Sequence, residues 1–327
     1  MLHNYYGTSP LRKILIICVK VWLAIMIIYC LLGITLALAL FSLFLVWKAG
    51  NRPLRGTYSY LLLGLSMGLF LYLFGTWIYF SIYTKYVFGI LLLLCIAAYT
   101  LRKHDHSARP LPRWKHYSNL LFTGLFVLLD IGYFTGTTGR PHTVELSFPF
   151  KPGNYFVLQG GKGLPTNVFH FSLRGAIYAM DIVKLNPQGG RATKIFSRQL
   201  DDYGIFGDTV YAPCDGLVLR AESNNPDNIP PNMSRGPKNT NQVLLETPGY
   251  YVFMGHLKMG SVCVTEGQYV RQGTALGCVG NSGFSTEPHL HIQVHAKQAG
   301  IPWYRGKPLY ILFNGKGYLL NEVINAK

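Results

Sequence analysis

The chain has 327 residues, of which 50% are hydrophobic and only 13% are charged, and its net charge is +16. This length suits about two domains. The composition excludes a disordered or collagen-like chain and favours a portion embedded in a membrane. Residues 1–135 hold +10 of the net charge, mostly between apolar segments, where basic side chains indicate membrane topology rather than nucleic-acid binding.

Four apolar segments precede residue 136, and we expect each to form a transmembrane helix. The first covers 14–47 and is broken only by Lys20. It is longer than one upright helix needs, yet two helices and a turn would be cramped. We therefore favour one tilted helix from about Val21, with a pair of helices as the alternative. The later segments are 60–80, 86–101 and 120–135.

The charges between these segments predict the orientation of the chain. The loops 48–55 and 102–115 together hold eight Lys and Arg residues, whereas the opposite side holds five. Because basic loops stay in the cytoplasm, we expect everything after the fourth helix to lie outside. No cleavable signal peptide is expected, since the first apolar run is too long and lacks a small-residue cleavage site. Asp130 in the fourth segment is compatible with an ion path, although a lone carboxylate near a helix end more often reaches the interface or a partner.

After about residue 136, short alternating strands with Gly and Pro turns replace the apolar segments. This pattern predicts an antiparallel β domain over 150–327. A linker at 136–149 would join it to the transmembrane domain, 1–135. The polar stretch 223–242, rich in Pro and Asn, predicts a loop on the sheet.

Three cysteines lie in this β part, namely Cys214, Cys263 and Cys278. Cys263 and Cys278 flank a hairpin, so they either form a disulfide or remain small buried thiols on strands. The chain has no CxxC motif, so a zinc site made of thiolates is not expected.

A strand at 288–294 carries the first functional signal, the pair His289 and His291. Residues two apart on a strand face the same way, so both imidazoles lie on one face while Leu290 turns into the core. One imidazole can bind a metal while the other acts as a base beside it. His295 either continues this face or is a solvent-exposed histidine at the end of the strand.

Two further candidates lie upstream of that strand. His256 follows the strand expected at 250–254. Asp181 stands in an otherwise apolar strand, where a buried carboxylate is normally paired or bound to a metal. The simpler alternative is an ion pair between Asp181 and Arg174 or Lys184.

The C-terminal part resembles a known family. Its segment 255–294 reads GHLKMGSVCVTEGQYVRQGTALGCVGNSGFSTEPHLHIQV and is similar to lysostaphin-type (LytM-like) zinc endopeptidases, which cleave peptide cross-bridges of bacterial peptidoglycan. The matching motifs are the HL after a strand, the paired V-x-x-G turns, the GNSG loop and the PHLH strand, with VYAPCDG at 210–216 upstream. The resemblance covers about residues 145–320. Biotinyl and lipoyl domains share such turns, but the lysine that they modify is missing between Arg271 and Lys297.

This resemblance implies a compact antiparallel β fold with an open groove and one Zn²⁺ ion. By motif position, Asp181 and His291 are implied as zinc ligands. His256 and His289 are implied as the catalytic histidines that activate water and stabilise the oxyanion. Zinc with three protein ligands keeps a fourth position for water and lowers the pKa of that water toward about 7.

The third zinc ligand departs from the usual family pattern. The family's first ligand lies four residues before the aspartate, and that position is Ile177, which cannot bind zinc. A variant pattern in the family places an Asn and a nearby His upstream of a Y-A-x-D strand. Asn167 and His170, followed by YAMD at 178–181, match this variant. The resemblance therefore implies His170 as the third ligand.

Together these features predict a multi-pass protein of the bacterial cytoplasmic membrane, with an all-β peptidase domain outside, in the periplasm or at the cell surface. Peptidoglycan cross-links are the expected substrate. The expected contacts are the lipid bilayer and peptidoglycan or peptide, without nucleic acid, and protein partners are left open. The alternative is a catalytically weak domain that acts as a scaffold or activator of other cell-wall hydrolases. A third class, a transporter with an appended domain, rests on Asp130 alone.

Overall fold

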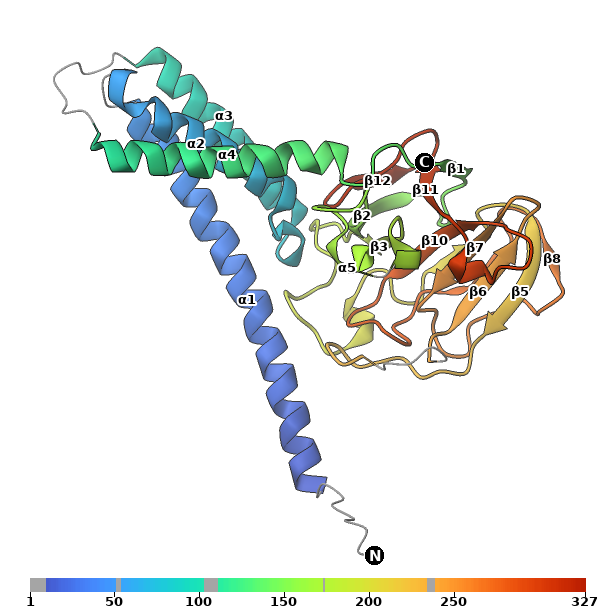
Figure 1. The fold of residues 1–327 in the computed structure, drawn as a ribbon. Coiled ribbons are helices and arrows are strands. Elements are labelled where there is room, and N and C mark those ends of the chain that lie inside the picture. The colour runs from blue at the N-terminus through green and yellow to red at the C-terminus, as the bar shows by residue number, and fades with distance from the viewer. Residues whose placement is uncertain (1–9, 51–53, 103–110, 173, 234–238) are drawn as a thin grey trace, which may run out of the picture.

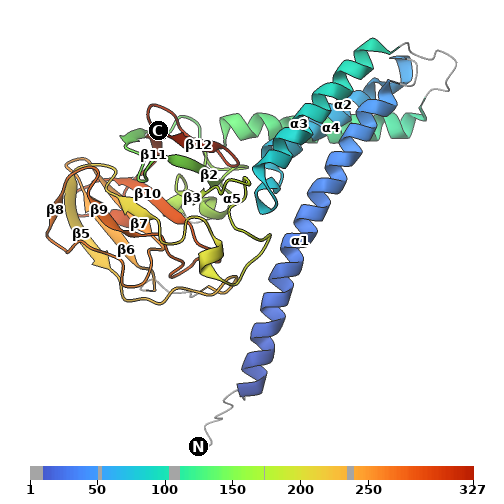
Figure 2. The same cartoon turned by 180° about the vertical axis from the view of Figure 1, so that it is seen from behind.

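The computed structural model describes residues 10–50, 54–102, 111–172, 174–233 and 239–327. A helical half and a β half lie side by side, and they meet at one end of the helices (Figure 1). Figure 2 shows the same arrangement from behind, with the long helix α1 extending well past the shorter helices.

Among the described residues, the helical half consists of four long helices: α1 (Pro10–Ala49), α2 (Leu54–Phe74), α3 (Ile82–Leu101) and α4 (Arg113–Thr135). By length and composition, three described segments are apolar enough to cross a membrane, namely Ile25–Ala49, Ile82–Leu101 and Arg113–Thr135, and Tyr58–Phe74 is a shorter apolar helix. The outer faces carry large apolar side chains: Leu93 is 66% exposed and Leu128 is 69% exposed. Exposed apolar surface of this kind is typical of membrane contact.

The helices differ from the expected segments at two points. The first apolar segment forms one continuous helix, as favoured, but this helix begins earlier than expected, at Pro10. The second segment, expected to reach residue 80, stops at Phe74. There the Trp77 indole donates a hydrogen bond back to the Leu71 carbonyl (2.8 Å), and the chain turns through the short 3₁₀ helix η1 (Trp77–Tyr79).

The β half contains the strands β1 (Thr143–Leu146), β2 (Gly153–Gln159), β3 (Met180–Lys184), β4 (Thr209–Tyr211), β5 (Gly216–Glu222), β6 (Gln242–Glu246), β7 (Tyr250–Gly255), β8 (Tyr269–Val270), β9 (Ala275–Cys278), β10 (Leu290–Ala296), β11 (Pro308–Phe313) and β12 (Val323–Ala326). One large sheet has the order β12-β2-β3-β10-β7-β6-β5-β8, with antiparallel neighbours throughout. Strands β4 and β9 form a small second sheet. The expected antiparallel β domain is thereby confirmed.

Strand alternation in β10 places apolar side chains on one face of the sheet and polar side chains on the other. In β10, Leu290 and Ile292 are completely buried, and they join a core that includes Ile182 of β3 and Leu245 of β6. Burying a side chain of this size contributes roughly 1.5–3 kcal/mol. The residue between the two buried positions, His291, therefore points to the opposite face, where the candidate site lies.

The junction between the halves is more ordered than a simple linker. The segment 136–149 contains β1, which pairs in parallel with β11, whereas the other strand pairs among the described residues are antiparallel. Just after α4, the Thr137 amide donates a hydrogen bond to the Lys162 carbonyl (3.0 Å). The connection is therefore held to the β half on both sides of residue 140.

Asn321 joins the β half to the helical half. Its side-chain amide donates hydrogen bonds to the carbonyls of Leu73 (2.9 Å) and Gly75 (3.0 Å) at the end of α2. The Lys85 ammonium in turn donates to the Asn321 carbonyl (2.9 Å). The turn after α2 and the end of α4 thus both reach the β half, so they lie at the same end of the helical half.

The structure bears on two questions that the sequence left open. The carboxylate oxygens of Asp130 are buried and have no hydrogen-bond partner within the described part of the chain, so the side chain does not reach a partner. Cys263 and Cys278 are free thiols rather than a disulfide, and Cys263 is exposed. Cys214 is likewise free and packs against the core of the β half.

Candidate active site

Two adjacent strands and a short helix bring three ligand-type side chains together. In the antiparallel pair β3–β10, His291 lies directly opposite Asp181. The short helix α5 (Val168–Phe171) supplies His170. One nitrogen or oxygen of each of these three side chains lies within 4.8 Å of the others. The structure thus brings together the three residues implied as zinc ligands.

Asp181 stands at the centre of this cluster. Its Oδ1 lies 3.0 Å from His291 Nδ1 and its Oδ2 lies 3.4 Å from His170 Nε2. The alternative ion pair with Lys184 is wrong, because Lys184 pairs with Asp208 at 2.8 Å. The Arg174 side chain lies outside what the structure describes.

The amide side chains of Asn167 and Gln293 orient the two ligand-type histidines. Asn167 Oδ1 accepts a hydrogen bond from His170 Nδ1 (2.8 Å), while its amide group donates to the Ile177 carbonyl (3.1 Å). Gln293 Oε1 accepts from His291 Nε2 (3.0 Å). The remaining nitrogens, His170 Nε2 and His291 Nδ1, both face the Asp181 carboxylate, and in the neutral rings they are the atoms that would present lone pairs to a metal. Ile177 thus contributes its backbone where the usual family ligand would contribute a side chain.

The cluster is electrostatically coupled. Burial opposes ionisation of Asp181, but the imidazoles of His170 and His289 hold its pKa well below its usual range. Burial also opposes protonation of His170, yet the Asp181 carboxylate overcomes this effect and raises the His170 pKa. Asp181 is therefore an anionic oxygen donor at neutral pH, which is the form that binds a metal.

His256 and His289 stand beside the cluster as a second pair. Their ring centroids are 4.8 Å apart, and His289 Nε2 lies 3.5 Å from Asp181 Oδ1. His256 directly follows β7 and adopts a positive φ of 65°, a strained conformation for a residue with a β-carbon. Its ring nitrogen Nδ1 donates to the Ser282 carbonyl (2.8 Å).

The hydrogen bonds of this second pair make Nε2 the proton-accepting atom of each ring in its neutral form. His289 Nδ1 donates to the Glu287 carbonyl (2.8 Å), just as His256 Nδ1 donates to Ser282. Burial, together with neighbouring histidines, lowers the pKa of His256 well below its usual range, so this imidazole is neutral. The pair can therefore accept protons from a group bound at the cluster.

His295 belongs to the framework of the fold and not to the solvent-exposed surface. It is fully buried, its Nδ1 donates to the Gly306 carbonyl (3.0 Å), and its ring meets that of Trp303 edge-on. Of the two alternatives for His295, the solvent-exposed one is wrong: the side chain continues the face of His291 and is buried, with the Trp303 indole packed against it.

Some residues at the site were not expected from the sequence. Gln293 lies two positions after His291 on β10, so strand alternation was a sufficient signal to find it. Ser282 and Glu287 act through backbone carbonyls in the loop before β10. No side-chain pattern in the sequence reports such a role.

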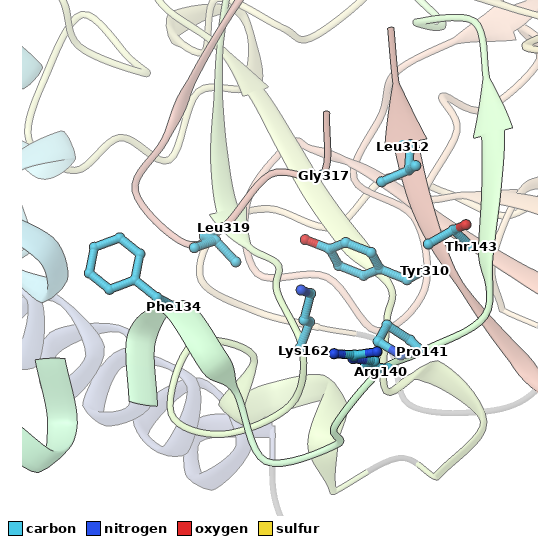
Figure 3. Close-up of a pocket in the computed structure, with 9 residues that line it drawn as sticks. All are labelled: Phe134, Arg140, Pro141, Thr143, Lys162, Tyr310, Leu312, Gly317 and Leu319. Carbon is cyan, nitrogen blue, oxygen red and sulfur yellow. The ribbon is translucent and has the colours of Figure 1, made fainter. Parts of the chain in front are cut away.

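The cavity drawn in Figure 3 is separate from this cluster. It has a volume of about 350 Å³ and lies between the end of α4 and strand β11, with Phe134, Tyr310 and Lys162 on its wall. None of the five predicted site residues lines it. The candidate site is thus defined by its side-chain cluster and not by this cavity.

Part of the chain that holds the candidate site matches a known protein family. Residues 202–302 match the model of peptidase family M23, which confirms the resemblance to the lysostaphin-type peptidases. His256, His289 and His291 lie within the matched residues, whereas His170 and Asp181 precede them. No match was found among curated proteins.

Two similar solved structures are both peptidases. The catalytic domain of the antimicrobial peptidase lysostaphin from Staphylococcus simulans is 20% identical, over 47% of this chain and 80% of that chain, with a TM-score of 0.25. A zinc-containing peptidase from Vibrio cholerae is 18% identical, over 50% of this chain and 41% of that chain, with a TM-score of 0.26.

Proposed function

We propose that this chain, whose residues 202–302 match the model of peptidase family M23, is a membrane-anchored zinc endopeptidase that hydrolyses peptide bonds in peptidoglycan cross-links. One observation carries the proposal: the cluster of His170, Asp181 and His291 lies beside the pair His256 and His289. A domain that served only as a scaffold would have no use for this combination.

The donor set of the cluster fits zinc. Two imidazole nitrogens and one carboxylate are a ligand set found in catalytic zinc sites, where a fourth position stays open. The hydrogen bonds from His170 to Asn167 and from His291 to Gln293 are of the kind that orients metal-binding histidines. Zinc held there supplies a Lewis acid for the scissile carbonyl and for a water molecule.

The second histidine pair supplies the proton transfers. We assign His289 as the general base, because its Nε2 faces the cluster and because Asp181, 3.5 Å away, would favour the imidazolium that forms. Burial lowers the pKa of His256, so this imidazole is less suited to take up a proton. We assign it to hold the attacking water through Nε2, since its Nδ1 donates to the Ser282 carbonyl. It becomes an oxyanion donor only after it has taken up a proton.

The helical half supports the membrane part of the proposal. Three of its described segments are long and apolar enough to span a bilayer, and the turn after α2 reaches the β half together with the end of α4. The β half would therefore lie on the side opposite the basic loops, outside the cytoplasm. In a bacterial cytoplasmic membrane, this placement brings the site to peptidoglycan.

The test combines metal analysis with digestion of purified peptidoglycan by the full-length protein in detergent. We expect one zinc per chain and new termini at cross-bridge peptide bonds, identified by mass spectrometry. Asp181→Ala should lose both the zinc and the products. His142→Ala, which removes an exposed histidine outside the cluster, is the matched control and should keep both.

The competing function is a catalytically weak domain that activates other cell-wall hydrolases. The sequence feature behind it is Ile177 at the usual first-ligand position. A protein that binds no zinc and releases no peptides, yet stimulates a partner hydrolase, would contradict the peptidase proposal and support this one.

A further inference from the structure

The helical half contacts the β half at the turn that follows β3. Residues 187–191, which we name the docking loop, lie against the start of α3, the end of that helix that faces the β half in Figures 1 and 2. The Ile82 amide donates a hydrogen bond to the Gly189 carbonyl (2.8 Å), and Ser81 Oγ donates to the Gln188 carbonyl (2.6 Å). Gly189 has a φ of +75°, and a β-carbon there would lie 2.9 Å from Ser81 Oγ, so only glycine suits this close approach.

Arg191, the last residue of the docking loop, is a buried cation with 1% of its surface exposed. Its guanidinium forms a bidentate pair with Glu287, with Nε to Oε1 and Nη2 to Oε2 both at 2.8 Å. The ring of Tyr79, which belongs to η1 in the helical half, covers the guanidinium at 4.3 Å from Cζ to the ring centroid. A buried charge is costly unless such partners surround it. One wall of this charge site is therefore built by the helical half.

Glu287 connects this charge site to the catalytic histidines. Its carboxylate is held by Arg191, while its backbone carbonyl accepts the hydrogen bond from His289 Nδ1 (2.8 Å). Ser285 Oγ donates to the same carbonyl (2.8 Å). The carbonyl sets both the tautomer and the ring orientation of His289, because a neutral imidazole that donates through Nδ1 must accept through Nε2. A displacement of Glu287 would therefore displace the imidazole.

We propose that Tyr79 and Arg191 are positioning residues through which the helical half holds His289 in its working orientation. The inference rests on the proposed peptidase function, because it assigns His289 as the base. It goes further by making the helical half part of the catalytic apparatus as well as an anchor. The chain of contacts runs from the Tyr79 ring to the Arg191 guanidinium, the Glu287 carboxylate and carbonyl, and the His289 ring.

The predicted consequence is a change in turnover without a change in zinc. Loss of the Tyr79 ring leaves Arg191 less well held, and a small displacement of a catalytic group lowers turnover steeply. This series of contacts does not include the hydrogen bonds that orient the ligand-type histidines, from His170 Nδ1 to Asn167 and from His291 Nε2 to Gln293. A residue that served stability alone would leave kcat unchanged once the protein is folded.

The experiment compares three variants of the full-length protein. Tyr79→Leu removes the aromatic face and should lower kcat about tenfold, with KM and zinc content unchanged. Tyr79→Phe keeps the face and should restore wild-type kcat. Tyr83→Phe is the matched control: it removes the hydrogen bond from the Tyr83 hydroxyl to the Pro187 carbonyl (3.2 Å) on the docking loop without touching Arg191, and it should behave as wild type.

A second readout does not depend on hydrolysis. Backbone amides of residues 284–289 should exchange with deuterium faster in Tyr79→Leu than in wild type, as measured by mass spectrometry, and at the wild-type rate in Tyr79→Phe. Arg191→Lys keeps the charge but loses the bidentate hydrogen bonds to Glu287, so it should also lower kcat and speed amide exchange. This variant replaces Tyr79→Leu in the experiment if Tyr79→Leu does not fold.

The outcomes separate the two proposals. Wild-type kcat and unchanged exchange in both Tyr79→Leu and Arg191→Lys would overturn the positioning role. An equal loss of kcat in Tyr83→Phe would also overturn it, because the effect would then belong to docking in general. A wild-type protein that hydrolyses nothing would defeat the peptidase proposal, while the exchange rates of 284–289 would still decide whether the helical half orders this loop.

Discussion

The helical half and the β half bury their side chains in opposite ways. In an apolar 18-residue stretch of each of the three candidate membrane-spanning helices, only 11–22% of residues are buried within the protein. The β half instead has a continuous apolar core, and it gathers its functional polar groups on one outer face of β3 and β10. The comparison teaches that the helical half leaves most of its apolar surface uncovered by the protein, whereas the β half buries a continuous core and holds the candidate site on its outer face.

The largest effect should come from the chemistry on the β side. His289→Ala removes the assigned base and should lower kcat on purified peptidoglycan by roughly 10²–10⁴-fold with zinc retained. Leu93→Ala, on the outer face of α3, should leave kcat unchanged because its side chain is 66% exposed. Rates of peptide release measured by mass spectrometry check both, and an equal loss in the two variants would break the comparison.

The next effect concerns stability. Leu245→Ala empties a completely buried position in the core of the β half and should lower the free energy of unfolding by about 2–5 kcal/mol. Leu128→Ala, at an α4 position that is 69% exposed, should change it by less than about 0.5 kcal/mol. Urea unfolding of the full-length protein in one detergent measures both. Similar costs for the two variants would mean that the helical half has a core of its own at this position.

A smaller effect should follow from loosening a zinc ligand without removing it. Asn167→Ala frees the His170 ring from its 2.8 Å hydrogen bond and should weaken zinc binding by about 10–100-fold. Asn154→Ala, an exposed asparagine on β2, is the control and should bind zinc like wild type. Competition with a chromogenic chelator gives the two dissociation constants. Unchanged affinity in Asn167→Ala would show that His170 is not a ligand.

The smallest effect is a pH dependence of stability. Burial lowers the pKa of His295, so the folded protein keeps this imidazole neutral at a pH where the unfolded chain protonates it. The unfolded state then binds more protons, and the free energy of unfolding should fall below about pH 6.5, by at most about 1.4 kcal/mol per pH unit for this one group. His295→Asn should reduce that slope in urea titrations between pH 7 and pH 5. An unchanged slope would mean that His295 titrates alike in both states.

The fold could be predicted where pattern and packing agree. Apolar length marked the helical segments, and strand alternation placed Leu290 in the core with His291 on the opposite face. The end of α2 at Phe74 was missed, because it depends on side-chain hydrogen bonds to the backbone, from Trp77 nearby and from the distant Asn321, that leave no apolar pattern. The strand β1 was missed because its partner β11 is far away in the sequence.

The site could be predicted only in part, for a similar reason. His289 and His291 follow from alternation on one strand, whereas His170 came from family resemblance and is brought to Asp181 by the fold. The roles of Arg191 and Glu287 depend on two loops that meet in space. Their sequence neighbourhoods carry no sign of it, because long-range ion pairs leave no local pattern.

The tied junction after α4 has a consequence for reach. Residues 136–142 are the ones between α4 and β1, and a chain of that length spans at most about 25 Å even when fully extended. Thr137 and β1 hold this segment to the β half, so it cannot extend to its full length. The candidate site is therefore held close to the ends of the helices. If the protein is the membrane-anchored peptidase that we propose, substrate strands must come to this layer, and cleavage would be confined to the part of the wall nearest the membrane.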